Sequence, residues 1–217
     1  MLAPCSAAVH AGIALGATLS SQTVARGVPL SDGGPTVQAS ADWDGADGAY
    51  AGVHAAPGLS LAGNAGVTEL SAYGGLARRL ANGASVDAGV IRHQFRGAGA
   101  YSYSELYTGI AFDRLSARLS WSPAYYGEGG HTLYAETNGF RPLGERFKLL
   151  AHLGWLHGLA GAAAQQRDRL DTRLALSFDQ GDWNVQLAWL ARRRIGAGAT
   201  DRLPAPRALA LSASVAF

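Results

Sequence analysis

Hydrophobic and polar residues alternate along several long stretches of the chain, most regularly near its C-terminal end. The apolar face of segment 207–217 holds Leu209, Leu211, Ala213, Val215 and Phe217. The same period of two recurs in segments 114–125, 169–179 and 182–193. Because successive side chains of a β-strand point to opposite faces, the pattern predicts strands with one apolar and one polar face. A run of about ten residues exceeds the usual ~5–6 of soluble strands and matches the length of a tilted membrane-spanning strand.

Turn-forming residues divide the chain into about twelve such strands, since Gly, Pro, Asn and Asp interrupt the alternation at intervals. The predicted strands are 11–24, 36–44, 48–56, 66–79, 84–94, 101–112, 114–125, 131–140, 145–157, 169–179, 182–193 and 207–217. Short turns such as Asn82-Gly83 alternate with longer Gly- and Pro-rich connections such as 25–35, 57–65 and 194–206. This alternation is typical of outer-membrane barrels. We therefore expect an all-β fold, an antiparallel up-and-down transmembrane β-barrel formed by residues 11–217. Residues 1–10 would be a leader or the remnant of a signal region.

Aromatic residues gather near the ends of the predicted strands, on their apolar faces. The predicted membrane-interface residues are Trp43, Trp121, Phe147, Trp155, Phe178, Trp183, Trp189 and Phe217. If the first strand runs outward, Trp121, Trp155 and Trp189 fall toward the outer end and the others near the periplasmic end. Two aromatic belts are a membrane signature. The alternative is that these rings form the core of a soluble β-sandwich, which does not predict their sorting by strand end.

The composition of the 217 residues narrows the class of protein further. Hydrophobic residues make up 48% and charged residues 16%, whereas soluble domains have roughly 25% charged residues. No apolar run reaches the ~18 residues of a transmembrane helix. The net charge of +2 gives no reason to expect nucleic acid as a partner. Cys5 is the only cysteine, so neither an intramolecular disulfide nor a cysteine metal cluster can form.

On this interpretation the polar faces of the strands line the interior of the barrel. The predicted pore-lining residues are Arg26, Gln38, Asp42, Glu69, Tyr73, Glu105, Tyr107, Arg118, Glu136, Lys148, Asp171, Arg173 and Gln186. Both signs of charge are present, so facing residues could form a transverse field that orients a polar solute. The alternative is that they form inward salt bridges that fill a narrow barrel. The sequence leaves both open.

Signals for an enzyme are weak, and we predict no catalytic residue, no cofactor and no metal site. The histidines lack metal-ligand spacing, and His152 and His157 fall on opposite faces of one strand. No Gly-x-Ser-x-Gly nucleophile turn occurs. A lipid hydrolase whose triad is scattered over several strands is the remaining enzymatic alternative. Arg192-Arg193-Arg194 at the outer end of a strand is a candidate for contact with lipopolysaccharide phosphates, or simply a solvated rim.

With these features in view, the sequence resembles the TorF-type porin family of proteobacterial outer-membrane proteins. The similar segments are Leu19-Ser20-Ser21, Arg26-Gly27, Ser31-Asp32 with Pro35, Gln38 and Asp42, Gly48–Gly52, Glu105–Gly109, and Tyr125–Gly130 with Tyr134 and Glu136. The family often has Tyr-Arg-Phe before its Arg-Gly pair, whereas this chain has Thr23-Val24-Ala25. The chain also resembles outer-membrane barrels in its terminal strand ending at Phe217, which implies recognition by the barrel-assembly machinery.

Together, the alternation and the resemblance predict a porin-like channel in the outer membrane of a Gram-negative bacterium. Its expected role is passive diffusion of small polar solutes, and its expected surroundings are outer-membrane lipid and lipopolysaccharide. The alternative is a barrel of the same construction that does not conduct and serves a structural or adhesive role.

Overall fold

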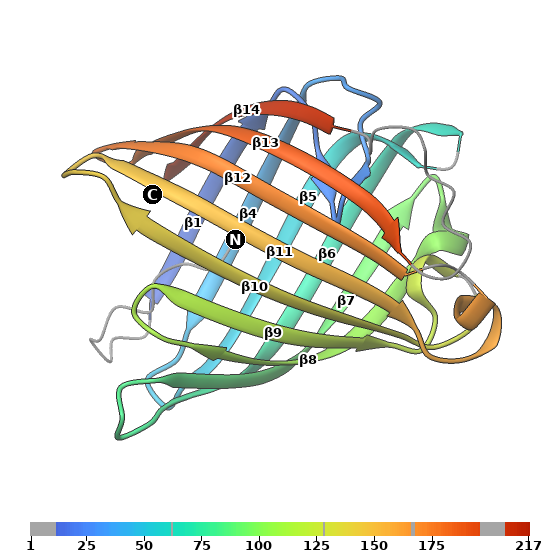
Figure 1. Cartoon of the computed structure of the whole chain (residues 1–217), viewed down its shortest axis with the longest axis horizontal. Helices are drawn as coiled ribbons and strands as arrows, with labels where there is room; N and C mark the ends of the chain where they lie inside the picture. The colour runs from blue at the N-terminus through green and yellow to red at the C-terminus, as the bar shows by residue number, and fades with distance from the viewer. Residues whose placement is uncertain (1–11, 62, 128, 166–167, 196–206) are drawn as a thin grey trace.

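The computed structural model describes residues 12–61, 63–127, 129–165, 168–195 and 207–217, and these form a closed antiparallel β-barrel (Figure 1). The wall strands are β1 (Gly12–Ser20), β4 (Thr36–Asp44), β5 (Ala49–Leu61), β6 (Asn64–Arg79), β7 (Ser85–Arg96), β8 (Tyr103–Ala111), β9 (Leu115–Ser122), β10 (Thr132–Pro142), β11 (Phe147–Gly158), β12 (Asp168–Gln180), β13 (Trp183–Ile195) and β14 (Arg207–Ala216). The predicted fold class is confirmed: twelve strands within the described ranges close the cylinder.

Each wall strand pairs with its neighbours in the chain, and the barrel closes where β1 meets β14. This seam runs from the pair Gly16–Ala216 to the pair Ser20–Ser212. The β12–β13 ladder, by comparison, runs from Asp168–Ile195 to Gln180–Trp183. A closed ring leaves no strand edge, so the backbone groups of every strand are available to pair with a neighbour.

The two ends of the barrel differ. At one end, here called the turn end, the strands are joined by short turns and both described chain termini lie there (Figure 1). The turn at Asn82-Gly83 illustrates the local chemistry: Gly83 has φ +86°, and the Asn82 side chain accepts a hydrogen bond from the amide of Ala84. At the opposite end, the loop end, lie longer connections that contain three short 3₁₀ helices, η1 (Gly99–Tyr101), η2 (Tyr125–Gly127) and η3 (Gly161–Gln165). No helix of the described residues is long and apolar enough to cross a membrane.

The two largest errors in the predicted boundaries both lie at the loop end. The strand predicted at 11–24 ends at Ser20, because the chain then turns into the barrel and forms a short hairpin of β2 (Val24–Ala25) and β3 (Val28–Pro29). The connection predicted at 57–65 is not a long loop: β5 continues to Leu61 and β6 begins at Asn64, with irregular register around Pro57-Gly58. Pro57 in a strand is compatible with such a bulge. The first eleven residues and most of the 194–206 connection lie outside the described residues.

The two faces of the wall differ in polarity over most of its height. Large apolar side chains are exposed on the outward face, for example Ile13 (73%), Leu187 (53%) and Leu211 (54%). Their neighbours in sequence, such as Gln186, point inward and form hydrogen bonds along the inner face of β12 and β13. The alternation of side chains in a pleated strand produces this separation, because every second residue faces the same side.

This polarity reverses at the loop end of β7. Arg92, Gln94 and Arg96 are exposed on the outward face, whereas His93 and Phe95 point inward, and Phe95 is only 1% exposed. The apolar residues inside the barrel at this level belong to a packed core that the hairpin completes.

Candidate functional site in the barrel lumen

The hairpin β2–β3 extends from the loop end into the lumen and is the feature that shapes its interior (Figure 1). Its two central residues, Arg26 (φ +47°) and Gly27 (φ +71°), are both left-handed and connect the pairs Ala25–Val28 and Val24–Pro29. Two left-handed residues define a type I′ turn, the tight turn whose twist matches that of paired strands. The left-handed conformation of Arg26 costs about 1 kcal/mol, so its surroundings must offset that strain.

The base of the hairpin is fixed to the barrel wall by hydrogen bonds around Thr23. The Thr23 hydroxyl lies 2.6 Å from that of Thr36 and accepts a bond from Gln38 Nε2 at 2.9 Å. The amide of Leu30 donates to the carbonyl of Thr23, and the amide of Ser60 donates to the carbonyl of Leu30. Because these bonds join the hairpin to β4 and β5, the hairpin is an integral part of the folded barrel.

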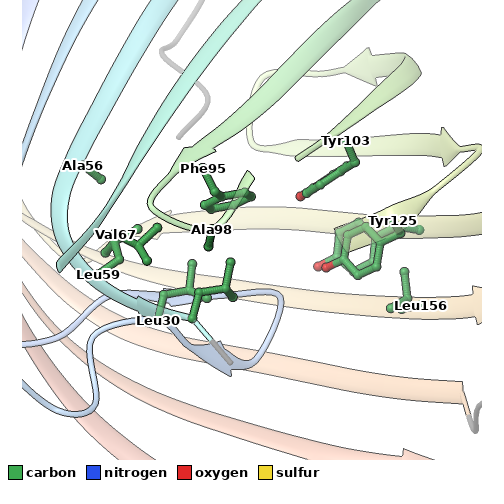
Figure 2. Packing of buried hydrophobic residues seen from close by; sticks show 11 residues of the cluster. Leu30, Ala56, Leu59, Val67, Phe95, Ala98, Tyr103, Tyr125 and Leu156 are labelled. Carbon is green, nitrogen blue, oxygen red and sulfur yellow. The ribbon is translucent and has the colours of Figure 1, made fainter. Parts of the chain in front are cut away.

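A hydrophobic cluster holds the hairpin from one side (Figure 2). Leu30, after β3, is 1% exposed and belongs to the same cluster as Leu59, Val67 and Phe95, which point inward from β5, β6 and β7. Burying a leucine or phenylalanine side chain contributes roughly 1.5–3 kcal/mol. The cluster therefore excludes water from this part of the loop-end lumen.

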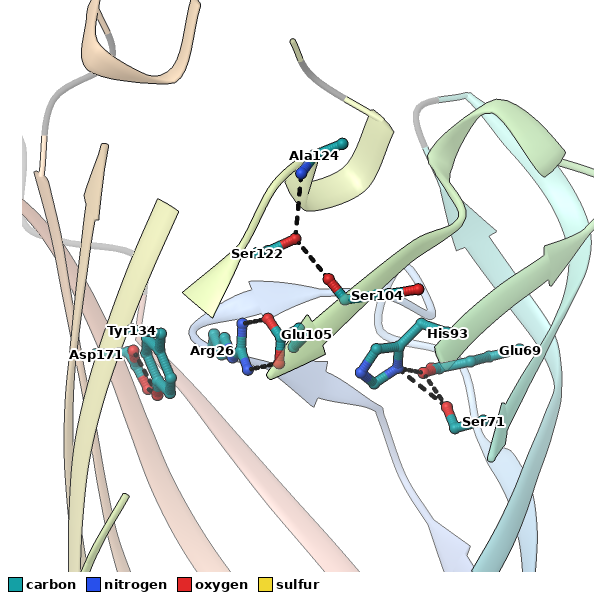
Figure 3. A network of polar contacts seen from close by, with 10 residues as sticks. All are labelled: Arg26, Glu69, Ser71, His93, Ser104, Glu105, Ser122, Ala124, Tyr134 and Asp171. Carbon is teal, nitrogen blue, oxygen red and sulfur yellow. Dashed lines mark hydrogen bonds and ion pairs between the residues drawn. The ribbon is translucent and has the colours of Figure 1, made fainter. Parts of the chain in front are cut away.

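The tip of the hairpin crosses to the opposite wall, where Arg26 forms an ion pair with Glu105 (Figure 3). Its Nη1 and Nη2 atoms each donate to one carboxylate oxygen of Glu105 on β8, both at 2.6 Å. The guanidinium carbon lies 4.1 Å from the ring centroid of Tyr134 and 5.3 Å from that of Tyr125. The side chains of Arg26 and Glu105 are 18% and 3% exposed. Bidentate hydrogen bonds between a guanidinium and a carboxylate that are largely shielded from solvent are among the stronger ionic contacts.

Gly27 allows this close approach to the wall. A β-carbon at Gly27 would lie 2.8 Å from Cβ of Asp171 and 3.1 Å from Cβ of Arg192. A glycine is therefore required both by the positive φ and by the space beside β12 and β13.

A second polar group lies beside the tip, around Asp171 on β12. Nε2 of His152 lies 2.9 Å from Asp171 Oδ1, and the Tyr134 hydroxyl donates to the same carboxylate at 3.2–3.3 Å. Nδ1 of His152 lies 2.8 Å from Asn138 Oδ1 and 3.9 Å from Glu136 Oε2. Two carboxylates, Asp171 and Glu105, thus lie on either side of the Arg26 guanidinium (Figure 3).

The turn-end half of the lumen is lined by more exposed polar groups. Arg118 Nη2 lies 3.2 Å from Asp87 Oδ2, and its guanidinium carbon lies 4.4 Å from the ring of Tyr107. The Tyr50 hydroxyl is 2.9 Å from both the Asp87 carboxylate and the Tyr107 hydroxyl. The Tyr73 hydroxyl donates to Asp42. These contacts come from wall residues alone, without the hairpin.

On the other side of the lumen, polar side chains of β11, β12 and β13 are linked to one another by ion pairs and hydrogen bonds. Lys148 Nζ lies 2.8 Å from Asp179 Oδ2, with the two side chains 43% and 32% exposed. Asn184 donates to Asp179, and Arg173 donates to Gln186. Charges of opposite sign therefore pair here too, but in contact with solvent.

The predicted pore-lining residues all lie inside the barrel, and the structure brings them into three groups. The first joins Arg26 to Glu105, with Asp171 and Glu136 nearby; the second joins Asp42 to Tyr73 and Arg118 to Tyr107; the third joins Lys148, Arg173 and Gln186 through Asp179 and Asn184. Gln38 lies beside Thr23, and Glu69 beside His93. Arg26, which the prediction placed in the connection 25–35, reaches the lumen because this connection folds inward as the hairpin β2–β3.

The predicted interface aromatics are distributed between the two ends with one exception. Six side chains lie on the outward face near a strand end or in contact with a turn: Trp43, Trp121, Phe147, Phe178, Trp183 and Phe217. Trp155 also faces outward and donates through Nε1 to Asp168. Trp189 lies halfway along β13, opposite Leu174 and Leu209, and not near its outer end. The prediction placed Trp189 too close to the outer end of its strand, because β13 extends to Ile195 and the predicted strand ended at 193.

The three consecutive arginines of β13 do not form one patch. Arg192 and Arg194 alternate with Arg193, and the tip of the hairpin packs against Arg192 from inside the barrel. Arg193 is therefore on the outward face. Arg193 and Arg194 are exposed at this end of the strand and Arg192 is only partly so, and contact with lipopolysaccharide stays a prediction.

One group of lumen residues has the composition of a hydrolytic triad but not its geometry. Nδ1 of His93 lies 3.0 Å from Ser71 Oγ and 2.8 Å from Glu69 Oε1, and Ser71 also donates directly to Glu69 (Figure 3). A triad requires the acid on one ring nitrogen and the nucleophile on the other. Among the residues that the structure describes, no three His, Cys, Asp or Glu side chains are grouped as metal ligands.

Sequence reasoning missed the residues that seat the hairpin, namely Leu30, Leu59, Val67, Phe95, Tyr103 and Tyr125. The sequence does contain a signal for them. Phe95 lies on the same, inward face of its strand as His93, whereas the charged residues Arg92 and Arg96 lie on the outward face. Such a reversal along one strand indicates that the interior becomes apolar at that height. The motif residues Arg26-Gly27, Glu105, Tyr125 and Tyr134, on which the family resemblance rests, converge at the same place.

Comparison with known proteins places this architecture among outer-membrane barrels. A family model for bacterial proteins of unknown function, Gcw_chp, matches residues 5–194. The chain belongs to the Gcw_chp family. No curated protein sequence matches this Gcw_chp chain.

Solved structures share the fold of this Gcw_chp protein at low sequence identity. The KdgM porin superposes with a TM-score of 0.59 and 12% identity, covering 94% of this chain and 99% of the porin. The NanC porin gives 0.59 and 9%, covering 93% and 98%. The COG4313 outer membrane channel from Pseudomonas putida F1 gives 0.53 and 12%, covering all of both chains. At such identities the similarity establishes the barrel fold.

Proposed function

We propose that this Gcw_chp protein is a channel in the outer membrane of a Gram-negative bacterium that passes small hydrophilic solutes by passive diffusion. The observation that carries the proposal is the polarity of the closed wall: an exposed apolar outward face surrounds an interior lined with charged and hydrogen-bonding side chains. A membrane barrel needs this arrangement because its outward side chains meet hydrocarbon and its lumen holds water. The barrel fold shared with KdgM, NanC and the COG4313 channel, and the resemblance to TorF-type porins, support the same function.

The inserted hairpin would set the narrowest part of the path. Arg26 and Glu105 span the loop-end lumen with side chains 18% and 3% exposed, whereas Lys148 and Asp179 in the turn-end half are 43% and 32% exposed. A solute that enters from the loop end would meet the hairpin first and then a wider polar section. Side chains that line such a constriction determine which solutes pass.

A non-conducting structural or adhesive barrel is the second candidate. The apolar cluster around Leu30 and Phe95 favours it, because this cluster occupies lumen volume that a permanently open channel would leave to water. On this reading the paired charges fill the barrel and do not select solutes.

Single-channel recording of the purified protein in planar bilayers distinguishes the two candidates. We expect discrete openings of the wild type and a several-fold larger conductance when residues 24–29 are replaced by Asn-Gly. Thr23 and Leu30 are already joined by a backbone hydrogen bond, so a two-residue turn can connect them. Arg141→Ala, at the exposed turn end, serves as the control and should leave conductance unchanged. If neither the wild type nor the shortened variant opens at any salt concentration, the second candidate is correct.

We also propose surfaces that the expected partners would contact. Arg92 and Arg96 face outward at the loop end and, with Arg193, replace the consecutive arginines as our proposed contacts for lipopolysaccharide phosphates. Phe217 is 76% exposed and its backbone pairs with Leu15, which leaves its ring accessible to the barrel-assembly machinery. The double variant Arg92→Ala/Arg96→Ala should retain less lipopolysaccharide on purification, and Phe217→Ala should assemble more slowly.

Lipid hydrolysis is the function that the geometry favours least. Ser71, His93 and Glu69 share one ring nitrogen and lie inside the barrel, away from the lipid that a hydrolase of this kind must reach. Sustained release of fatty acid from phospholipid micelles by the purified protein would contradict this conclusion.

A further inference from the structure

Arg26 is held in the lumen in the way that a protein holds a bound cationic ligand. Both Glu105 oxygens accept from its terminal nitrogens, and the rings of Tyr134 and Tyr125 lie 4.1 and 5.3 Å from its guanidinium carbon. These three side chains, here called the cage, come from β8, β10 and η2. The guanidinium comes from a different element, the hairpin. Figure 3 shows Arg26 between Tyr134 on one side and Glu105 on the other.

The cage requires a cation. Glu105 is 4% exposed and, within the described part of the chain, its carboxylate has Arg26 as its hydrogen-bonding partner. A buried carboxylate without a partner is strongly unfavourable, so removal of Arg26 would leave a site that favours any cation of suitable shape. Asp171, beside Tyr134, adds negative charge at the same place.

The geometry of the cage selects for a planar fork. Two parallel N–H···O bonds match a guanidinium and not an ammonium, and aromatic faces attract a delocalised cation. Among the described ranges, the buried hydroxyl of Tyr125 has no hydrogen-bond partner. Burial raises the pKa of this phenol, so the hydroxyl stays protonated and can bond to a further polar atom of a bound solute.

Neighbouring arginines limit the affinity of the cage. Arg169 lies 6.0 Å from the Tyr125 ring, and Arg192 packs against the hairpin beside Gly27. Their positive charges oppose a second cation, so the cage should bind weakly. Weak binding suits a site on a diffusion path, because a solute must leave as readily as it arrives.

We propose that Arg26 is a tethered ligand in a solute-binding site, and that a small solute bearing a guanidinium group competes with it for Glu105, Tyr134 and Tyr125. Entry of such a solute displaces the hairpin tip from the wall. Binding does not depend on conduction, but passage of the solute rests on the proposed channel function. This assigns a substrate class, guanidinium-bearing organic cations, to the lumen.

Binding of methylguanidinium to the purified full-length protein tests the cage directly. Isothermal titration should show saturable binding to Arg26→Ala and, because the tethered side chain competes at high effective concentration, roughly tenfold weaker binding to the wild type. Methylammonium, which lacks the fork, should bind Arg26→Ala more weakly than methylguanidinium does. Binding should be lost in Arg26→Ala/Glu105→Gln.

Two further variants control for the loss of an arginine and for misfolding. Arg173→Ala removes a lumen arginine that donates to neutral Gln186, and it should bind methylguanidinium no better than the wild type. Arg26→Gln keeps a long side chain at the hairpin tip without its charge, and it should behave as Arg26→Ala does. If neither Arg26 variant gains binding, or if the Glu105→Gln double variant binds equally well, the cage proposal is wrong.

Conductance separates this proposal from the proposed function. In planar bilayers, methylguanidinium should reduce the current of Arg26→Ala by occupying the vacated cage and should leave that of Arg26→Ala/Glu105→Gln unchanged. Absence of current in every variant contradicts the channel, while titration still decides the cage. Current without any methylguanidinium effect, together with absent binding, contradicts the cage and leaves the channel intact.

Discussion

The two halves of the lumen are built from the same kinds of side chain but in different environments. At the loop end the Arg26–Glu105 pair is nearly enclosed, with side chains 18% and 3% exposed, and Leu30 and Phe95 pack beside it. In the turn-end half the Lys148–Asp179 pair is 43% and 32% exposed. An ion pair contributes far more to a unique structure when water is excluded, because solvent screens exposed charges. The loop-end pair therefore fixes a position, whereas the turn-end pair leaves an adaptable polar wall.

The largest effect is expected from breaking the enclosed pair. Glu105→Gln should lower the free energy of docking the hairpin by about 3–5 kcal/mol, because Arg26 loses its buried partner. Hydrogen exchange of the Leu30 and Ser60 amides, which bond to the hairpin base and wall, measures this change. Glu145→Gln, in an exposed turn, is the matched control and should leave both rates unchanged. Equal protection in all three proteins would show that the pair does not hold the hairpin.

The next effect compares the outward face with the wet half of the lumen. Leu187→Arg should cost about 2–4 kcal/mol, since Leu187 is exposed on the outward face near mid-strand. Gln186→Arg, one residue away and inside, should cost less than about 1 kcal/mol. Urea titration of the protein refolded in lipid vesicles gives both values. Similar losses for the two would mean that the assigned faces, or the hydration of this half, are incorrect.

A smaller effect is expected at the tip of the hairpin. Gly27→Ala should weaken docking by about 1–3 kcal/mol, because the residue is left-handed and its new methyl group would meet Asp171. Gly83→Ala is the control, since Gly83 is also left-handed but has open space around it and lies in a turn at the other end of the barrel. Amide exchange at Leu30 should respond to the first substitution only. If exchange at Leu30 is unchanged in both variants, the hairpin tip accommodates the added methyl group without loss of docking free energy.

The smallest effect belongs to the exposed pair. Asp179→Asn should change the free energy of unfolding by less than about 1 kcal/mol, and raising the salt concentration should reduce the difference further. Denaturation in vesicles at two ionic strengths gives the comparison with Glu105→Gln. A salt-independent loss as large as that of Glu105→Gln would remove the distinction between the halves.

The wall of the barrel could be predicted because one physical rule governs it. Neighbours in sequence face different media, and their polarity shows which: Leu187 faces outward and Gln186 inward, and the same holds for Leu211 and Ser212. The rule failed where a strand leaves that simple environment. At Ser20 the chain leaves the wall. At Pro57-Gly58 the strand continues through a bulge, although Pro and Gly at these positions predicted a loop.

The hairpin could not be predicted because its strands are too short to show a period and its partners are distant. Arg26 and Glu105 are 79 residues apart, and nothing local in either segment indicates their pairing. The Arg-Gly pair was visible as a motif, and the reversed polarity around Phe95 was visible as an anomaly. The Arg-Gly pair and the Phe95 region are related only by the closure of the barrel, which brings β8 and β10 opposite the connection between β1 and β4.

The short seam between β1 and β14 has a mechanical consequence. Its paired register runs from Gly16–Ala216 to Ser20–Ser212, with further backbone bonds between Leu15 and Phe217 and between Ser21 and Leu211, so fewer cross-strand bonds resist separation there than along β12–β13. Under heat or lateral tension the cylinder should separate along this line before it separates along β12–β13. A cysteine crosslink across Ala17 and Val215, which face each other in the seam, would raise the melting temperature more than one placed between longer ladders.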